Sequence, residues 1–327
     1  MRIKNCRACN KTKLKKLFSL GNMAFTGKFP KENQKIDKEP IDLIICSSCE
    51  LVQLGHSFDL KYLYGPDYGY RTGINKTMTN HVKGVVKYLS KSTKLKKNDH
   101  VLDIASNDGT LLNFYNRNII TFGIDPVLNK YIESYKNINY KVSNFFSANK
   151  VQEKVKKKFK IITALSVFYD AANPNLFLKD VKKLLIKDGI FLLEFADLAS
   201  IIKYKMFDTI CHEHLEYYST KVIINLCLKN GLRVFDIKQN EINGASKQFF
   251  VCHYDSKYKN NNKVINKVLN SEKKLKLADE ITFKKFIKEI NYSKKKLVTF
   301  LKKEKKNRKK NSLLWSLNKR ECFITIL

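Results

Sequence analysis

The stretch Val101–Leu112, VLDIASNDGTLL, decides the fold of this chain. Three of its first four residues are apolar and predict a buried strand, and residues 105–109 are small or polar, as a tight turn requires. A helix is expected to follow the turn. A strand, a glycine-bearing turn and a helix in this order predict a nucleotide-type site, because backbone N–H groups and a helix N-terminus can approach the ligand there.

A second apolar stretch covers residues 119–124 and is followed directly by Asp125. A carboxylate at the tip of this strand can accept hydrogen bonds from the two hydroxyls of a ribose. With Asp103 at the end of the first strand, the pattern predicts an adenosine-type ligand in a doubly wound α/β domain. Gly109 alone is a weak signal and G-x-G-x-x-G is absent, so an ordinary β-α-β unit is the alternative.

Strand and helix patterns alternate beyond this unit, which predicts a parallel sheet covered on both faces. Because ligands bind at the carboxyl ends of such strands, Phe145 and Phe168 are candidate contacts, with Phe168 against a base ring. The expected strands are 99–104, 119–124, 138–142, 159–165, 190–195, 232–238 and 247–254, and the expected helices are 109–117, 127–136, 149–157, 174–187, 219–230 and a Lys-rich stretch over 258–310.

The composition fits a globular protein of 327 residues with two domains and a sizeable core. The net charge of +33 suggests a nucleic-acid binder, but 56 of the 63 basic residues are Lys and only 7 are Arg, spread over the whole chain. Arg is the residue that reads bases and clamps phosphates. We therefore favour an AT-rich genome and solvated faces over a nucleic-acid surface, which is kept as the non-enzyme alternative. Attraction of anionic small substrates is compatible with this charge.

The sequence has no apolar run of roughly 18 residues and no N-terminal apolar segment of a secretory signal. We therefore expect a cytoplasmic protein without membrane contact. In that compartment, cysteines act as ligands more often than they form disulfides.

Residues 1–60 contain two C-x-x-C pairs, Cys6 with Cys9 and Cys46 with Cys49, separated by 36 residues. Each pair can supply two thiolates to a tetrahedral ion, so the spacing predicts a structural Zn²⁺ site. The alternative is four unrelated buried cysteines. The polar chain between the pairs is expected to bury little, leaving the metal to supply the folding free energy.

Two further segments are rich in chemically active side chains. Residues 61–73 form a loop with several tyrosines and one arginine, suited to holding a polar ligand or to packing between domains, and residues 74–92 predict a helix. Residues 207–218, FDTICHEHLEYY, contain two histidines at i and i+2, which on a helix do not face together. A general base beside a carboxylate therefore fits better than a metal site, with an ordinary polar loop as the alternative.

In this order, the segments resemble the sugar C-methyltransferases, S-adenosylmethionine-dependent enzymes with an N-terminal zinc-binding domain that methylate carbon in deoxysugar nucleotides. The resemblance covers residues 6 to about 310 and rests on the cysteine pairs, YGYRTG, VLDIASNDGTLL, FYDAANP, FDTICHEHLEYYS and NEINGASKQ. It implies a class I methyltransferase domain over 98–257, preceded by an aromatic loop and leading helix over 61–97. The implied cofactors are S-adenosylmethionine and Zn²⁺, and the implied substrate is a nucleotide-linked keto-deoxysugar.

The resemblance also implies a chemistry for the site. A base removes the proton beside a sugar keto group, and the enolate carbon attacks the methyl group of the sulfonium. His214 takes the place of the family's base, with Glu213 and His212 beside it. The expected cofactor contacts are Asp103, Ser106, Asn107, Asp108, Gly109, Asp125, Phe145, Phe168 and Tyr70, and the expected substrate contacts are Tyr64, Tyr68, Arg71 and Asn243.

The chain departs from the family at three places. Cys211 stands where the family has a tyrosine, and Ala105 replaces the first glycine of the donor turn, which a negative φ would tolerate. Residues 258–310 predict the helical start of a C-terminal domain that lacks its partner. The codons of residues 311–327, read one nucleotide later, can give the family segment ILYYGLSTKGNVLLQY, so we expect a frame-shifted tail. A methyltransferase with another acceptor and an inactive remnant are the alternatives, and a monomer is expected.

Overall fold

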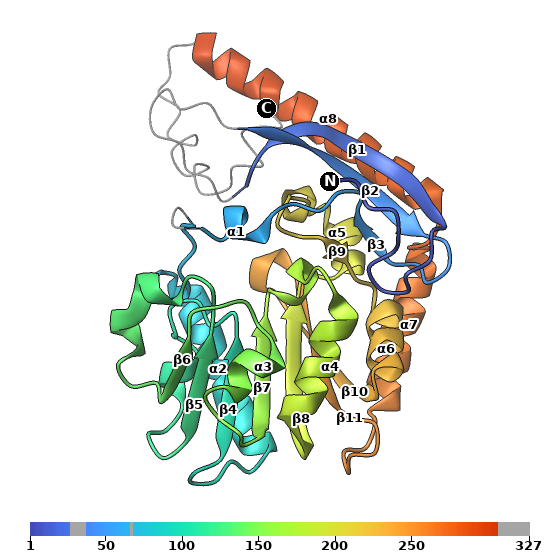
Figure 1. The fold of residues 1–327 in the computed structure, drawn as a ribbon. Coiled ribbons are helices and arrows are strands. Elements are labelled where there is room, and N and C mark those ends of the chain that lie inside the picture. The colour runs from blue at the N-terminus through green and yellow to red at the C-terminus, as the bar shows by residue number, and fades with distance from the viewer. Residues whose placement is uncertain (27–36, 66–67, 307–327) are drawn as a thin grey trace.

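The computed structural model describes residues 1–26, 37–65 and 68–306. The expected frame-shifted tail, 311–327, lies outside these residues. The fold contains a seven-stranded sheet and a four-stranded sheet, which lies over the carboxyl ends of the strands of the larger sheet (Figure 1). A long helix near the C-terminus lies alongside the smaller sheet.

The larger sheet has the strand order β10-β11-β8-β7-β4-β5-β6. Its neighbouring strands pair in parallel except around β11, which runs antiparallel to both β8 and β10. The seven predicted strands of this region are all present. They are β4 (His100–Ile104), β5 (Ile120–Ile124), β6 (Tyr140–Val142), β7 (Phe159–Leu165), β8 (Leu185–Phe195), β10 (Leu232–Asn240) and β11 (Ser246–His253).

Alternate residues of the central strands enter two different cores, which confirms the doubly wound arrangement. Val101 and Ile161 pack with the buried face of α2, whereas Leu102 and Ile162 pack with α4 and α6 on the other face of the sheet. Side chains on both faces are buried, as expected for parallel strands between helical layers. The helices are α2 (Lys76–Ser92), α3 (Ala148–Gln152), α4 (Pro174–Leu184), α5 (Leu198–Tyr204) and α6 (Thr220–Lys229).

Two predicted α-helices are wrong, because 109–117 and 127–136 contain only 3₁₀ turns, η2 (Leu112–Phe114) and η3 (Leu128–Tyr135). The first is rich in Asn and aromatic residues of low helix propensity. The second is kinked at Tyr131, where φ is −120°.

The smaller sheet has the order β1-β2-β3-β9, and its strands pair antiparallel. Its members are β1 (Leu14–Ala24), β2 (Lys38–Cys46), β3 (Val52–Leu54) and β9 (Glu216–Tyr217), and the short helix α1 (Leu60–Leu63) follows β3. The expectation that this region buries little is wrong, since Ile41 and Leu43 are fully enclosed. The cause is non-local: β9 and the C-terminal helix cover side chains that the sequence between the cysteine pairs cannot cover alone.

The C-terminal stretch forms α7 (Asn262–Leu275) and α8 (Glu280–Lys306). Phe283 and Phe286 of α8 pack against Phe18 of β1 with ring centroids 6.5 and 6.0 Å apart, so the expectation of a helix without a partner is wrong for this part of α8. Among the helices of the described residues, none combines the length and apolar character needed to cross a membrane.

A buried charge cluster fixes α7 to the larger sheet. Lys247 Nζ of β11 lies 2.7 Å from Asp197 and 2.5 Å from Glu272 of α7. The Thr220 hydroxyl, at the start of α6, donates a hydrogen bond to Glu272 at 2.5 Å. Since unpaired charges are expensive to bury, this cluster requires that α7 stay docked.

Candidate functional site

A cavity of about 650 Å³ lies at the carboxyl ends of the central strands, next to the smaller sheet. This is where a doubly wound sheet binds its ligands. Most of the predicted site residues line it, namely Tyr64, Tyr68, Tyr70, Asp103, Ser106, Asn107, Asp125, Phe145, Glu213, His214 and Asn243.

The turn after β4 shapes one side of the cavity. Ala105 and Asn107 have φ values of 56° and 51°, so the backbone is left-handed at both positions. The condition under which alanine is well tolerated here, a negative φ, is therefore not met, and a side chain in this region costs about 1 kcal/mol relative to glycine. The strained turn directs the Asn107 N–H at Asp125, which accepts it at 2.8 Å.

Asp125 has hydrogen-bonding capacity left for a ligand. Its Oδ2 accepts from Asn107 N–H and its Oδ1 accepts from Val127 N–H at 2.7 Å, so each carboxylate oxygen retains a lone pair. Asp103, at the end of the neighbouring strand, accepts from the Thr163 hydroxyl at 2.5 Å, and burial raises the pKa of its carboxyl to about 7. Two carboxyl groups at adjacent strand ends fit a ribose-bearing ligand.

Phe168 does not reach the cavity, contrary to the prediction. It is fully buried, with its ring centroid 5.0 Å from that of Tyr218 and 5.1 Å from that of Phe177. The chain enters a 3₁₀ turn, η4 (Phe168–Asp170), directly after β7, and this turn places Phe168 in the core. Phe177 and Phe146 line the cavity together with Phe145, and the sequence analysis missed both.

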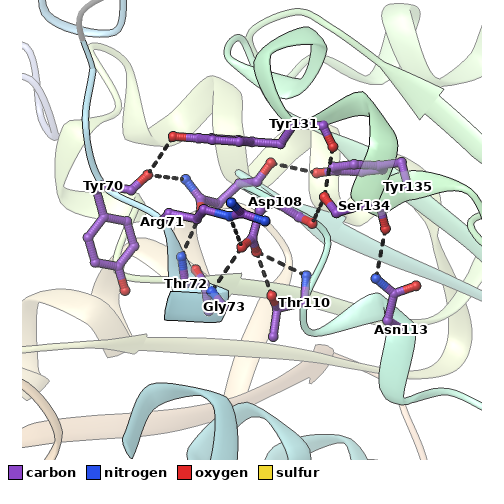
Figure 2. A network of polar contacts seen from close by, with 11 residues as sticks. Tyr70, Arg71, Thr72, Gly73, Asp108, Thr110, Asn113, Tyr131, Ser134 and Tyr135 are labelled. Atoms are coloured by element: carbon purple, nitrogen blue, oxygen red, sulfur yellow. Dashed lines mark hydrogen bonds and ion pairs between the residues drawn. The ribbon is translucent and has the colours of Figure 1, made fainter. Parts of the chain in front are cut away.

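Asp108, Gly109 and Arg71 do not line the cavity, contrary to their predicted contacts with cofactor and substrate. Asp108 and Arg71 instead connect two loops. Figure 2 shows Asp108 Oδ2 accepting from Arg71 Nε at 3.1 Å and from the Gly73 N–H at 2.9 Å, while its Oδ1 accepts from the Thr110 hydroxyl at 2.6 Å. These bonds fasten the aromatic loop, including η1 (Thr72–Ile74), to the turn after β4.

Gly109 is required for packing beneath the same turn. Its φ is +72°, and a Cβ there would lie 2.6 Å from Ile138 Cδ1. The predicted glycine is therefore structurally important, although it makes no contact with the cavity.

His214 is oriented by backbone contacts on both sides. Its Nδ1–H donates to the Thr209 carbonyl oxygen at 2.6 Å, so Nε2 is the ring nitrogen that can gain or lose a proton. Its ring centroid lies 4.1 Å from that of Tyr169, and the Leu215 N–H donates to the Tyr169 carbonyl oxygen at 2.8 Å. Burial by itself lowers the pKa of His214, but neighbouring Cys211 and the nearby carboxyl groups raise it to about 10.

His212 points away from the cavity, so its predicted catalytic role is not supported. It is fully buried, with its ring 4.8 Å from Phe25 and 4.9 Å from Phe58 between centroids. Its Nε2 lies 3.1 Å from the Glu39 carbonyl oxygen, and burial lowers its pKa. A turn at residues 212–213, in which the His214 N–H donates to the Cys211 carbonyl oxygen at 3.3 Å, separates His212 from His214.

Asp170 is a site residue that the sequence analysis missed. It ends η4, lines the cavity and accepts a hydrogen bond from the Tyr64 hydroxyl at 2.7 Å. Burial raises the pKa of Asp170 well above its usual range, although His214 and Tyr64 act in the opposite direction. The signal available was its place in FYDAANP, immediately after a predicted strand.

Asn243 closes the cavity from the loop between β10 and β11. It lies in a 3₁₀ turn, η6 (Ile242–Gly244), with φ of 53°, and its Nδ2 donates to the Ser166 hydroxyl at 3.3 Å. This contact joins the loop to the end of β7.

The four predicted cysteine ligands come together. Sγ of Cys6 lies 3.6 Å from Sγ of Cys49, Sγ of Cys9 lies 3.5 Å from Sγ of Cys46, and all four lie within 4.8 Å of one another. Zinc–sulfur bonds of about 2.3 Å place the sulfur atoms of a tetrahedral site about 3.8 Å apart. The cluster therefore fits Zn²⁺.

Arg7 links the cysteine cluster to the cavity. Its Nη1 donates to the Leu54 carbonyl oxygen at 2.7 Å, and its Nε lies 3.7 Å from Oε1 of Glu216, which lines the cavity. Both side chains are almost inaccessible to water, so the ion pair is buried. The segment that carries Cys6 and Cys9 is therefore joined to the cavity wall by this ion pair.

Known proteins are similar to parts of this chain in sequence or in structure. It is 25% identical to the C-methyltransferase NovU of Streptomyces niveus over 252 residues, which cover 75% of this chain and 59% of NovU. The chain thus spans less than two thirds of that relative. Solved structures with partial similarity are the plantazolicin methyltransferase BamL (15% identity, TM-score 0.44, covering 55% of this chain and 87% of that one) and the magnesium protoporphyrin IX methyltransferase of Synechocystis PCC 6803 (14%, 0.41, 59% and 92%).

Three family models match consecutive parts of the chain in the order that the sequence predicted. A zinc binding domain matches residues 6–64, and a C-methyltransferase C-terminal domain matches 241–312. A methyltransferase domain matches 74–237, which is half of the chain and includes the turn after β4. The fold is that of a class I methyltransferase, and the chain belongs to this methyltransferase domain family.

Proposed function

We propose that this protein transfers a methyl group from S-adenosylmethionine to a carbon atom of a nucleotide-linked keto-deoxysugar. The observation that carries the proposal is that His214 and the turn after β4 open into one cavity. A donor on the turn and a proton acceptor beside it are the two elements that methylation of carbon requires. The similarity to NovU and the C-methyltransferase C-terminal match support transfer to carbon.

In the donor half, Asp125 would accept hydrogen bonds from the ribose hydroxyls through its remaining lone pairs, and Phe145 would contact the adenine. Ser106, Asn107, Tyr70 and Asp103 line the same part of the cavity and would hold the remainder of the donor. S-adenosylmethionine supplies an electrophilic methyl group on a sulfonium when it is bound. The chain's own task is to orient that methyl group toward the acceptor and to exclude water.

In the acceptor half, Nε2 of His214 removes the proton from the carbon next to the keto group. The bond to Thr209 keeps a proton on Nδ1, so that Nε2 is the nitrogen that exchanges protons. Cys211 and the nearby carboxyl groups, which raise the pKa of His214, stabilise the imidazolium that forms. Glu213, Tyr64, Tyr68 and Asn243 offer polar contacts to the sugar.

The four-cysteine cluster holds a structural Zn²⁺ in this proposal. All four positions of a tetrahedral ion are filled by thiolates, so no position is open for chemistry. The ion keeps the residues around Arg7 in place, and Arg7 supports Glu216 in the cavity wall.

Hydrogen–deuterium exchange tests the acceptor step without the donor. A thymidine-diphosphate 4-keto-6-deoxyhexose is incubated with the protein in D₂O, and deuterium at the carbon beside the keto group is followed by NMR. We expect exchange that His214→Ala slows by about 10²-fold or more. His253→Gln, a histidine outside the cavity, is the matched control and keeps the rate.

Calorimetric titration with S-adenosylmethionine separates the two halves of the proposal. His214→Ala is expected to bind the donor as the parent chain does, because donor contacts lie on the other side of the cavity. Donor binding without exchange on keto-sugar nucleotides would contradict the proposed acceptor and favour a methyltransferase for another small molecule.

A further inference from the structure

We infer that Cys211, Glu213 and His214 form a second metal site, open to the cavity and suited to Zn²⁺. The inference goes beyond the proposed function, and it rests on that function only in its effect on the base. The site is distinct from the four-cysteine cluster, because it combines a thiol, a carboxylate and an imidazole from one short segment.

The three ligand atoms are already close together. The sulfur of Cys211, a carboxylate oxygen of Glu213 and a ring nitrogen of His214 all lie within 4.8 Å of one another. Zinc binds these ligand types at about 2.0–2.3 Å, which places neighbouring ligand atoms of a tetrahedral site about 3.5 Å apart. Bringing the three ligand atoms from within 4.8 Å of one another to this spacing requires only small side-chain rotations. The three residues lie in the segment between the turn η5 (Phe207–Thr209) and β9.

The hydrogen bond of His214 is the one that metal-binding histidines use. The Nδ1–H group donates to the Thr209 carbonyl oxygen at 2.6 Å, so Nε2 is the nitrogen that an ion would bind in place of a proton. Such a bond to a backbone carbonyl orients the ring and increases the basicity of the ligating nitrogen. The backbone therefore prepares His214 as a ligand before any ion arrives.

The site has an open position, unlike the cysteine cluster. All three residues line the cavity, so the fourth position of a tetrahedral ion faces the space where the acceptor is proposed to bind. Three protein ligands and one exchangeable position are typical of accessible zinc sites. We expect this ion to bind more weakly than the ion of the four-cysteine cluster and to be removed by mild chelation.

Occupancy of the site and proton abstraction exclude each other. Nε2 has a single lone pair, which either binds the ion or accepts the proton of the substrate. Zn²⁺ at this site is therefore expected to stop deuterium exchange reversibly, so the protein would be active only when the second site is empty.

Cobalt titration of the full chain tests the site without donor or sugar. The protein is treated briefly with EDTA, its zinc content is measured by mass spectrometry, and Co²⁺ is then added while the thiolate-to-cobalt absorbance is followed. We expect one retained zinc and one added cobalt with a charge-transfer band. Cys211→Ser should abolish this band and weaken binding by more than the 10- to 100-fold typical of losing an outer-shell partner, while the first zinc stays.

Two further variants make the result decisive. Cys227→Ser changes a buried cysteine outside both clusters and should leave the cobalt band unchanged. Glu213→Gln should weaken cobalt binding but keep the charge-transfer band, because the thiol is intact. Absence of a second bound ion, or cobalt binding that is the same in Cys211→Ser, would overturn the inference. Neither result bears on deuterium exchange by the metal-free protein, so failure here is distinguishable from failure of the proposed function.

Discussion

The two sheets of this protein are built in different ways. The seven-stranded sheet uses residues 100–253 and has a hydrophobic core on each face. The four-stranded sheet takes three strands from residues 14–54, its fourth from 216–217, and its cover from α8. The first sheet can hold itself together by burial of its own segments, whereas the second depends on a metal cluster and on distant parts of the chain. The cavity takes its donor side from the first sheet and part of its acceptor side from the second.

The largest expected effect comes from Cys46→Ser, which removes a fully buried ligand of the cluster. We expect loss of zinc and of most of the roughly 10 kcal/mol that structural zinc lends a small domain. Hydrogen exchange should accelerate in β2 and stay slow in β7, while S-adenosylmethionine still binds. Cys252→Ser, outside the cluster, keeps the zinc. Loss of donor binding together with zinc would show that the two sheets behave as one unit.

Phe286→Ala tests whether α8 supports the smaller sheet. Phe286 is only 3% exposed, so removing its ring should lower the free energy of unfolding by about 3–5 kcal/mol, measured by urea denaturation. Phe300 lies on the same helix but is 47% exposed, and Phe300→Ala should change stability by less than about 0.5 kcal/mol. Equal effects of the two variants would contradict the packing of α8 on β1.

Asp103→Asn tests the burial of a carboxyl group in the larger sheet. The folded-state pKa of Asp103 is about 7, above its ordinary value of 3.8, so the unfolded state loses this proton first as pH rises. Stability should therefore fall between about pH 4 and pH 7, by an amount on the order of 2–4 kcal/mol. Thermal melts of Asp103→Asn should show a flatter profile, and the exposed Asp255→Asn should keep the parental slope in this window.

The smallest expected effect is that of Asp125→Asn on donor binding. The substitution replaces one carboxylate oxygen by an amide nitrogen and removes the negative charge, so a charge-assisted acceptor for a ribose hydroxyl is lost. S-adenosylmethionine binding should weaken by about 10- to 100-fold. Calorimetry measures the affinity, and zinc content should not change. Asp99→Asn, which alters a carboxylate outside the cavity, is the control. An unchanged affinity would remove Asp125 from the proposed ribose contact.

The same contrast explains what the sequence could predict. The strands of the larger sheet follow from local apolar runs and their alternation with helices, and the donor-side positions follow from the ends of those strands. The cysteine cluster follows from two local spacings. In the smaller sheet, the pairing of β3 with β9 joins residues far apart in the chain, and no local pattern reports it.

The errors in the site have the same origin. Phe168 and His212 stand in the right segments, but their orientation depends on Tyr218, Phe25 and Phe58, which come from other parts of the chain. Asp170 was missed because its importance arises from contact with Tyr64, more than a hundred residues away. Residue type and strand position predicted where the cavity lies, and only the three-dimensional contacts showed which side chains enter it.

The late strand β9 has a consequence for how the protein is made. Residues 14–54 leave the ribosome well before Glu216 and Tyr217, and at 5–20 residues per second this interval is roughly ten to thirty seconds. During that time β3 has an open edge, while all four cysteines of the cluster are already available. Metal uptake can therefore precede completion of the sheet, and the ion would guard an unfinished edge against pairing with other nascent chains.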